Sequence, residues 1–416
     1  MAITDAPVAA QYESWVYPNP IPDLVEAAAR GAYYDASDPS LIRRKFWPRP
    51  VEPENLDILI AGCGSNQAAQ IALTNPGSRV TGIDLSSASL AHEQYLKQKH
   101  ELHNLELRQL ELEQVSALEQ SFDLIISTGV LHHIPDPAAG LRALGEVLRP
   151  HGVMSLMLYG EYPRVGVHMM QEAFRLMGLE QDARGVHMVR HTLERVAPPW
   201  HHVATYVKTD RDLSFDAGLV DTYLHARERA YTIADIMQLI EDCELKFQGW
   251  HDNLDYSISF QIPDPQNPLR LIIEQLPLVD QWRCVELIGQ ALARQFFLVC
   301  HKDRPDRDFV LDFGGDEWLD YVPNLRPGLR VQQPEAFEGE PLSTLPRPTA
   351  TVRFGHRVVL GPLESVLLGR IDGERTILEI LDDEAIDASN AMRNVQSARA
   401  FFQRMAGLDH LLFQIP

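Results

Sequence analysis

Cysteine is scarce in this sequence: four occur among 416 residues, and no two are spaced as a CxxC pair. Such scattered thiols argue against a disulfide framework and against a cysteine-ligated zinc site, and they indicate a reducing compartment. We expect each cysteine to be a small buried hydrophobic residue. The sixteen histidines include adjacent pairs but no matching set of cysteine and carboxylate ligands, so we predict no metal centre.

Long apolar runs are also missing. No run approaches the roughly 18 residues that a membrane-spanning helix needs. The N-terminal residues lack the basic and apolar regions of a signal peptide. We therefore expect a cytoplasmic protein that does not enter a membrane.

Basic residues are few, with 37 Lys and Arg against 58 Asp and Glu, so the formal net charge is −21 at pH 7. Such a surface repels phosphate backbones, which makes nucleic acid a poor partner. The hydrophobic fraction of 45% is ordinary for a globular protein. The length predicts two or three domains with a substantial core.

One stretch, residues 56–86, carries the strongest pattern. The apolar run at 58–61 is typical of a buried parallel strand. Gly62 and Gly64 permit a tight turn and a close approach of the backbone to a ligand, and a following helix directs its N-terminus there. Asp84 ends a second strand, 22 residues after Gly62. That spacing suits a carboxylate that binds ribose hydroxyls, so we predict a nucleoside site.

Strands and helices alternate from about residue 56 to residue 160, which predicts an α/β domain with a parallel sheet. The following segment, 161–230, is mainly helical in pattern. Further strands are predicted at 247–250 and 295–300. We divide the chain into an N-terminal lid segment (1–50), the α/β domain (51–302) with a helical cap insertion (161–230), a proline-rich linker (303–350) and a small winged-helix-like α+β domain (351–416).

The glycine turn by itself does not choose between a dinucleotide and S-adenosylmethionine. A dinucleotide needs room for its pyrophosphate at the helix N-terminus. S-adenosylmethionine has no phosphate. It needs a carboxylate after the second strand, a polar contact for the adenine after the third, and a reacting face beyond the fourth. Asp84, Glu111 and the segment 127–133 supply these in order.

With these motifs in place, the sequence resembles the class I S-adenosylmethionine-dependent methyltransferases. The motifs concerned are the glycine turn (60–64), the acidic segment (83–86) and the block after the fourth strand (128–137). More narrowly, the chain is similar to bacterial methyltransferase modules often fused to tetratricopeptide repeats, which begin with a Gln-Tyr-Glu…Tyr-Pro segment as residues 11–18 do here. The resemblance covers roughly residues 10–302.

The resemblance implies a Rossmann-like sheet that binds S-adenosylmethionine and releases S-adenosylhomocysteine. It implies that Asp84 holds both ribose hydroxyls, that Glu111 lies near the adenine amine, and that Tyr12 is a candidate cover for the cofactor. Asn66 replaces a frequent third glycine and would narrow the site or add a hydrogen bond. The expected cofactor contacts are Tyr12, Ala61, Gly62, Cys63, Gly64, Asn66, Gln67, Asp84, Leu85, Ser86, Glu111, Leu112, Ser127, Thr128 and Gly129.

The candidate catalytic residues fall in two groups. His132 and His133 follow the fourth strand, where a side chain can face the transferred methyl group and remove a proton from the acceptor. Tyr223, His225 and Arg227 precede a helix that can overhang the strand ends, and Arg227 can hold a substrate carboxylate. Structural roles stay open for each of them, because a neutral histidine also packs and an arginine also forms salt bridges.

We therefore predict a methyltransferase that acts by in-line displacement on a small-molecule or peptide/protein acceptor. The alternative is an inactive S-adenosylmethionine-binding regulatory or scaffold protein. Residues 363–380 are similar to the helix-turn-helix of winged modules that bind leader peptides, although the Asp372-Gly373 turn and the Thr376 cap also explain this pattern structurally. A homodimer stays open, and no motif indicates whether the acceptor atom is N, O, S or C.

Overall fold

The computed structural model describes residues 6–30, 36–52, 54–289, 292–332, 349–351, 357–382 and 391–416. The chain folds as two compact units. Unit 1 consists of Met1–Asp38, Pro53–His251 and Asp255–Arg304, and unit 2 of Pro39–Glu52, Asp252–Leu254 and Pro305–Pro416. Among the described helices, none combines the length and the apolar character that crossing a membrane requires.

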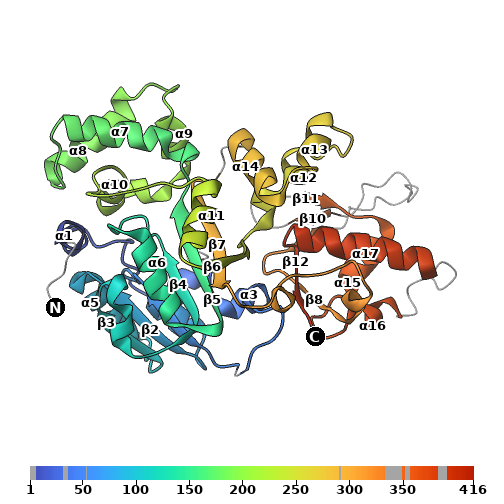
Figure 1. The fold of residues 1–416 in the computed structure, drawn as a ribbon. Coiled ribbons are helices and arrows are strands. Elements are labelled where there is room, and N and C mark those ends of the chain that lie inside the picture. The colour runs from blue at the N-terminus through green and yellow to red at the C-terminus, as the bar shows by residue number, and fades with distance from the viewer. Residues whose placement is uncertain are drawn as a thin grey trace. The chain divides into compact units, whose positions relative to one another are not determined.

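Unit 1 is built on a seven-stranded sheet with the order β3-β2-β1-β4-β5-β7-β6 (Figure 1). The parallel strands are β1 (Asp57–Ala61), β2 (Arg79–Asp84), β3 (Leu105–Gln109), β4 (Phe122–Thr128) and β5 (Leu148–Tyr159). β7 (Arg294–His301) runs antiparallel to both β5 and β6 (Leu245–Trp250). The predicted α/β sheet is confirmed. Its central strands are buried along nearly their whole length, as in a parallel sheet covered on both faces.

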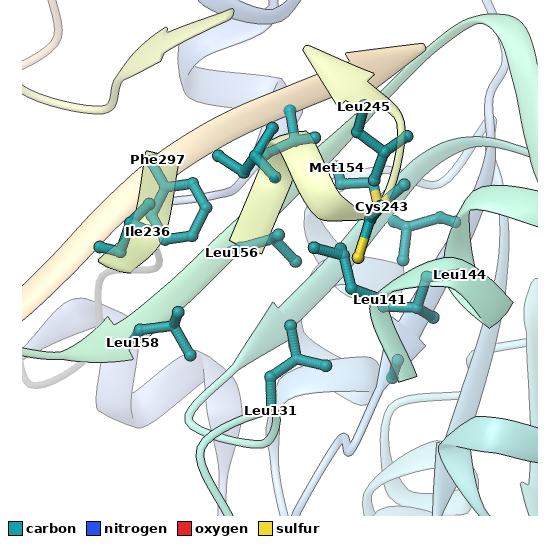
Figure 2. Packing of buried hydrophobic residues seen from close by; sticks show 14 of the residues in the cluster. Leu131, Leu141, Leu144, Met154, Leu156, Leu158, Ile236, Cys243, Leu245 and Phe297 are labelled. Atoms are coloured by element: carbon teal, nitrogen blue, oxygen red, sulfur yellow. The ribbon is translucent and has the colours of Figure 1, made fainter. Parts of the chain in front are cut away.

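Helices connect these strands and cover the sheet. Ser86, Asp136 and Thr232 each cap a helix with a side-chain oxygen that accepts a main-chain N–H of the first turn. Figure 2 shows side chains of α6 and α11 packed with those of β5, β6 and β7 in one hydrophobic core. These helices of unit 1 are α4 (Gln67–Thr74), α5 (Ser87–Lys99), η1 (Leu112–Leu118), α6 (Pro137–Glu146), α11 (Ile233–Asp242), α12 (Ile258–Gln261), α13 (Pro268–Ile273) and α14 (Leu278–Gly289). The short helix η5 (Asn253–Tyr256) has residues in both units.

The segment between β5 and α11 is helical, as predicted. It comprises η2 (Tyr162–Arg164), α7 (Val165–Leu176), α8 (Ala183–His191), η3 (Thr192–Val196), α9 (Val203–Thr209), η4 (Arg211–Ser214) and α10 (Asp216–Tyr223). These helices have a hydrophobic core of their own, which includes Phe174, Val189 and Leu219. We call this segment the cap. Two short helices precede the sheet in unit 1, α1 (Ala6–Ser14) and α2 (Leu24–Ala29).

Unit 2 combines helices with two small antiparallel sheets. One sheet pairs β8 (Val322–Leu325) with β12 (Leu411–Gln414), and the other has the order β11-β10-β9. Its core combines aliphatic side chains with aromatic ones, among them Trp318, Phe402 and Phe413. The remaining elements are α3 (Pro39–Phe46), η6 (Asp306–Asp308), η7 (Glu317–Asp320), β9 (Arg330–Gln332), β10 (Thr349–Thr351), β11 (Arg357–Val359), α15 (Pro362–Arg370), α16 (Ile377–Leu381) and α17 (Ala391–Gly407).

The two units divide the chain differently from the predicted boundaries. The predicted lid segment, 1–50, is split, because Pro39–Glu52 belongs to unit 2. The segment predicted as a linker, 303–350, contributes β8, β9 and the core residue Trp318, while its residues 333–348 lie outside the described part. Beyond residue 350 the sequence pattern predicts a strand at 351–354 and helices at 362–370, 376–382 and 389–406. The helices are observed as α15, α16 and α17. Most of the predicted strand lies outside the described residues.

Candidate active site

The glycine turn lies at the edge of the sheet where the parallel strands end. Gly62 and Gly64 have φ values of +78° and +55°, which side-chain-bearing residues rarely adopt. A Cβ atom at Gly62 would lie 2.3 Å from Val130 Cγ2, and one at Gly64 would lie 2.7 Å from Pro18 Cδ. Both positions therefore require glycine. Open α/β sheets bind their ligands at this edge.

Asp84 ends β2 beside this turn. Its Oδ2 accepts the main-chain N–H of Gly64 and its Oδ1 that of Ser86, both at 2.8 Å. Burial raises the pKa of Asp84, while these N–H groups act in the opposite direction. The two hydrogen bonds fix the orientation of the carboxyl group. Each oxygen has a further lone pair, so the pair can still accept two ribose hydroxyls.

Glu93 is a site residue that sequence reasoning missed. It lies on α5 and is fully buried, and its two carboxyl oxygens accept the N–H groups of Ala68 at 2.9 Å and Ala69 at 2.8 Å. Burial outweighs these hydrogen bonds and raises the pKa of Glu93 to about 8. The carboxyl group thus occupies the N-terminal end of α4, where a dinucleotide would place its pyrophosphate. The site therefore fits a nucleoside without phosphate better than a dinucleotide.

The segment 11–21 lies against this edge of the sheet. The carbonyl of Tyr12 accepts the Ser86 hydroxyl at 3.0 Å. The carboxylate of Glu13 accepts both the main-chain N–H and the hydroxyl of Ser87. Two residues at the start of α5 therefore hold α1 next to Asp84. We call residues 11–21 the strap.

Asn66 also binds the strap. Its amide nitrogen donates to the carbonyl of Asn19 at 3.1 Å, and its amide oxygen accepts the N–H of Ile21 at 2.8 Å. The neighbouring Ser65 hydroxyl donates to the Pro18 carbonyl at 2.7 Å. We had expected Asn66 to narrow the cofactor site or to add a hydrogen bond there. In the structure both of these side-chain hydrogen bonds of Asn66 go to the strap.

The other predicted cofactor residues gather at the same edge. Ser127 donates its hydroxyl to the Ala61 carbonyl at 3.1 Å, and the Gln67 amide donates to the Thr128 hydroxyl at 3.3 Å. Gly129 follows β4 with a φ of +78°. Burial raises the pKa of the Cys63 thiol. The carbonyl of Leu85 accepts a hydrogen bond from Gln109 Nε2. Glu111 and Leu112 are buried at the start of η1.

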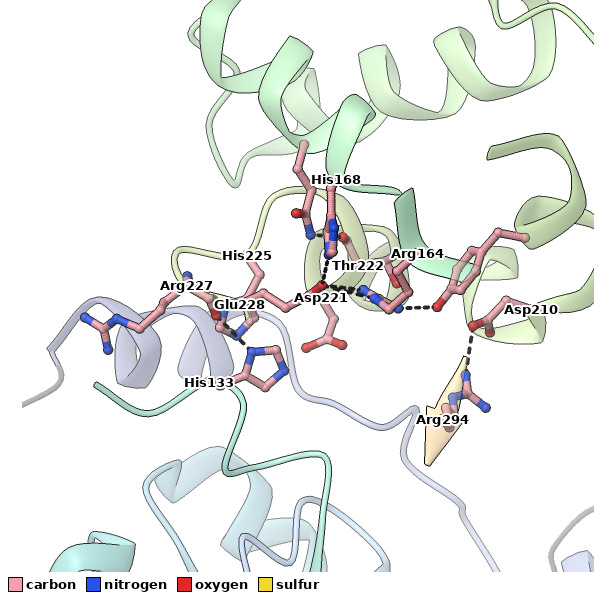
Figure 3. A network of polar contacts seen from close by, with 12 residues as sticks. His133, Arg164, His168, Asp210, Asp221, Thr222, His225, Arg227, Glu228 and Arg294 are labelled. Carbon is pink, nitrogen blue, oxygen red and sulfur yellow. Dashed lines mark hydrogen bonds and ion pairs between the residues drawn. The ribbon is translucent and has the colours of Figure 1, made fainter. Parts of the chain in front are cut away.

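His133 and His225 stack on each other beside the end of β4, with ring centroids 3.8 Å apart (Figure 3). The His133 Nδ1 lies 2.9 Å from the carbonyl of Arg227, which can only accept, so Nδ1 carries the proton and Nε2 keeps a lone pair. The His225 Nδ1 accepts the main-chain N–H of Arg227 at 3.0 Å. Burial, reinforced by His133, lowers the pKa of His225 well below its usual value. The neutral ring of His225 therefore carries its one proton on Nε2.

That proton points to a third group. The His225 Nε2 lies 3.2 Å from the Tyr12 hydroxyl, which donates in turn to Asp221 Oδ1 at 2.9 Å. One ligand atom each of His133, Asp221 and His225 lies within 4.8 Å of the other two. A metal ion at this point would need the lone pair of His225 Nε2. Because Nε2 carries the proton, the arrangement suits a hydrogen-bonded chain better than a metal centre.

Comparison with known proteins supports this account of the cofactor edge. Residues 59–154 match the model of a family described as a methyltransferase domain. This region is a class I S-adenosylmethionine-dependent methyltransferase domain. It contains the glycine turn, Asp84, Glu93 and His133.

Two relatives in sequence match different lengths of the chain. The chain is 30% identical over 260 residues to an uncharacterised protein of Synechococcus sp., covering 61% of this chain and 62% of that protein. It is 34% identical over 114 residues to a ubiquinone biosynthesis O-methyltransferase of Methylocella silvestris, covering 27% of this chain and 43% of that enzyme. The chain thus spans less than two thirds of the length of either relative.

Among solved structures, PKMT2 from Rickettsia typhi in complex with AdoHcy is similar, with a TM-score of 0.65 and 15% identity. The similarity covers 92% of this chain and 77% of that chain. At this identity it concerns the fold.

The other predicted catalytic residues do not belong to the cluster of His133, His225 and Asp221. His132 is buried and stacked on Tyr159, and its two ring nitrogens have no hydrogen-bond partner among the described residues. Burial lowers the pKa of His132 well below its usual value, so the ring is neutral. Tyr223 lies in the hydrophobic core of the cap. The Arg227 side chain is exposed and points away from His133, and only its main chain binds the two histidines (Figure 3).

A buried ion pair fixes the cap to the segment that carries His225. Arg164, in η2, and Glu228 are both buried, and Arg164 Nη2 lies 2.8 Å from Glu228 Oε2. Burial tends to raise the pKa of Glu228, but Arg164 outweighs it and the pKa is lowered. Sequence reasoning missed Arg164, Glu228 and Asp221, because the segment that contains them has no recognisable motif.

Proposed function

We propose that the chain is an S-adenosylmethionine-dependent methyltransferase in which His133 removes a proton from the acceptor. The cofactor supplies a methyl group already activated by its positively charged sulfur. Gly62 and Gly64 would meet its amino-acid part and Asp84 its ribose. The carboxyl group of Glu93 at the N-terminus of α4 supports this choice over a dinucleotide.

The observation that carries the catalytic part is the tautomer of His133. Its Nδ1–H is bound to the Arg227 carbonyl, which leaves the Nε2 lone pair available as a general base. The carboxylate of Asp221 lies within 4.8 Å of a ring nitrogen of His133. It would stabilise the imidazolium that forms when the ring of His133 takes up a proton. This arrangement suits an acceptor atom that bears a proton, on either a small molecule or a peptide.

We propose further roles for the strap and for unit 2. The strap would cover the bound cofactor and exclude water, which is supported by its hydrogen bonds to Asn66, Ser86 and Ser87. Unit 2 would be a winged-helix-like accessory module that contacts a peptide, which is supported by α15, α16 and the capping box at Thr376. A reducing, cytoplasmic setting agrees with the four free cysteines.

Calorimetry with S-adenosylmethionine, S-adenosylhomocysteine and NAD tests the cofactor, and we expect the first two to bind and NAD not to bind. Formation of S-adenosylhomocysteine in the presence of phenols, catechols, primary amines and lysine-containing peptides tests turnover. We expect at least one class to react, and His133→Ala to lower the rate by about 100-fold or more. Cofactor binding without turnover on any of these acceptors would support the regulatory alternative. Binding of NAD alone would refute the cofactor assignment.

A further inference from the structure

We infer that Tyr12 is a positioning residue for methyl transfer, and that its hydroxyl holds Asp221 and His225 in the arrangement that His133 needs. The inference rests on the proposed function. It goes beyond a cover for the cofactor, because it assigns the hydroxyl of Tyr12 to the acceptor side of the site and only its main chain to the cofactor side.

The contacts of Tyr12 join three separate parts of unit 1. Tyr12 comes from α1, Asp221 from α10 of the cap, and His225 from the segment before α11. The hydroxyl lies 2.9 Å from Asp221 Oδ1 and 3.2 Å from His225 Nε2. Asp221 and His225 are both buried.

The direction of this chain is fixed at its far end. The N–H of Arg227 donates to His225 Nδ1, so His225 Nε2 must donate to the oxygen of Tyr12. The hydroxyl proton of Tyr12 is then free to go to Asp221. The direction of each hydrogen bond therefore determines the direction of the next one. Tyr12→Phe would remove the middle member of this series of hydrogen bonds.

His133 depends on this chain in two ways. Its ring stacks on His225, and the Arg227 main chain binds both rings, so a displaced His225 moves the base. The carboxylate of Asp221 also lies within 4.8 Å of the ring of His133, close enough to stabilise positive charge that the ring acquires from the acceptor during catalysis. The charged and titratable groups that face His133 are Asp221, His225, His132, Tyr159 and the Arg164–Glu228 pair.

The hydroxyl also acts on the charge of Asp221. Burial raises the pKa of Asp221, whereas His133 and the hydrogen bond from Tyr12 act in the opposite direction. Loss of the hydroxyl therefore shifts the buried carboxyl group toward its neutral form. A neutral Asp221 no longer stabilises a protonated His133, so the base becomes weaker.

The cofactor side of Tyr12 is separable from this role. Its carbonyl accepts the Ser86 hydroxyl, and the next residue, Glu13, binds Ser87. Tyr12→Phe keeps the main chain, the ring and these contacts, and removes only the hydroxyl. The variant therefore distinguishes positioning of the base from covering of the cofactor.

The test compares Tyr12→Phe with the wild type in three measurements. Calorimetry with S-adenosylhomocysteine should give a Kd within about two-fold of the wild type. The kcat with an acceptor found in the screen above should fall about ten-fold or more. The acidic limb of the kcat–pH profile should move to lower pH, because a base without its carboxylate partner is protonated less readily.

Nitrogen-15 NMR of the histidine rings gives a readout that needs no turnover. In the wild type without cofactor, we expect His225 as the neutral tautomer with the proton on Nε2, and Tyr12→Phe should change its Nε2 resonance. Tyr95→Phe is the matched control. Its exposed hydroxyl donates to the carbonyl of Pro22, and its ring contacts His92, which is not part of the hydrogen-bonded chain through Tyr12. This variant should leave the Kd, the kcat, the kcat–pH profile and the Nε2 resonance of His225 unchanged.

Asp221→Asn should move the acidic limb in the same direction as Tyr12→Phe. The double variant should be no worse than the poorer single one, because both changes break one chain. A weaker S-adenosylhomocysteine affinity with an unchanged kcat would show that Tyr12 only covers the cofactor. A fall in kcat with an unchanged pH profile would equally contradict the inference.

A metal centre is the remaining competitor. Stoichiometric Zn²⁺ or Mn²⁺ binding that Asp221→Asn abolishes would overturn the hydrogen-bonded chain. A wild-type protein that neither binds S-adenosylhomocysteine nor turns over would refute the proposed function. If the wild type turns over and Tyr12→Phe turns over equally fast, this inference alone would be refuted.

Discussion

Glu93 accepts the main-chain N–H of Ala69 at 2.8 Å, so an acidic side chain of one helix binds the first turn of another. No motif in the sequence marks this contact, because Glu93 and Ala69 lie 24 residues apart on different helices. It determines which class of nucleoside the glycine turn can receive, because it takes up donors that a pyrophosphate would otherwise use.

Glu93→Gln should lower the free energy of unfolding by about 1–3 kcal/mol, because the new amide NH₂ would face a main-chain N–H that now has an acceptor. The carboxyl pKa of about 8 lies above its ordinary value, so its stabilising contribution is complete below about pH 4.5 and declines as the pH rises to 8. The advantage of the wild type over the variant should therefore shrink between pH 5 and pH 8. Urea denaturation at several pH values measures this. Glu241→Gln, on an exposed position of α11, should have no effect at any pH.

Asp84→Asn should weaken S-adenosylhomocysteine binding by about ten-fold or more, because an amide offers ribose hydroxyls one acceptor oxygen in place of two. Calorimetry measures the change. Asp84→Ala, which has no acceptor oxygen at this position, should bind S-adenosylhomocysteine more weakly still. If Asp84→Ala bound S-adenosylhomocysteine as well as the wild type does, the ribose assignment would be wrong.

Asn66→Ala should loosen the strap, because it removes two of its hydrogen bonds, worth about 1 kcal/mol each, and leaves those of Ser65, Ser86 and Ser87. Hydrogen exchange should become faster in residues 11–21. Cofactor affinity should fall by a few-fold, since binding must then order the strap. Gln98→Ala, at an exposed position of α5, is the control and should change neither quantity. Faster exchange with unchanged affinity would show that the strap does not cover the cofactor.

Arg164→Met should destabilise the protein by about 3–5 kcal/mol, because it removes the guanidinium from the buried Glu228 carboxylate and leaves only His168, 3.5 Å away, as an ion-pair partner among the described residues. Since Arg164 holds the pKa of Glu228 below its ordinary value, the pair stabilises the fold above about pH 4.5, and this contribution is lost as the pH falls through the lowered pKa. Denaturation of wild type and variant at pH 4 and pH 7 measures both effects. Arg175→Met, which breaks the exposed Arg175–Glu172 pair, should cost less than about 1 kcal/mol.

The cofactor edge could be predicted from the sequence because its signals are local. Gly62, Gly64 and Asp84 stand at fixed spacings from strand patterns, and parallel strands bring their ends to one edge. The helical pattern of residues 161–230 is local too, and the structure confirms it as the helices of the cap. The boundaries between the two units did not follow, because they depend on pairings such as β8 with β12 that join distant segments.

The acceptor side of the site resisted prediction for a related reason. Tyr12 and Asp221 are 209 residues apart, and no spacing rule joins a tyrosine in an N-terminal helix to an aspartate in a cap. The adjacent His132 and His133 also look equivalent in the sequence. Only the three-dimensional partners, a carbonyl for His133 and an aromatic face for His132, give them different roles.

The interleaving of the two units has a consequence for how the protein is made. The chain enters unit 2 at Pro39 and returns to unit 1 after Glu52, long before the rest of unit 2 is synthesised. Within unit 2 the N–H of Ile415 then bonds the carbonyl of Pro48, and β12 follows nearly the whole chain. On the ribosome, unit 1 can complete its sheet once β7 has emerged. The helix α3 can pack only after β12 has been synthesised, and until then the apolar side chains of Ile42 and Phe46 stay unburied. Nascent-chain lengths between these two points are therefore where we expect a chaperone to be needed most.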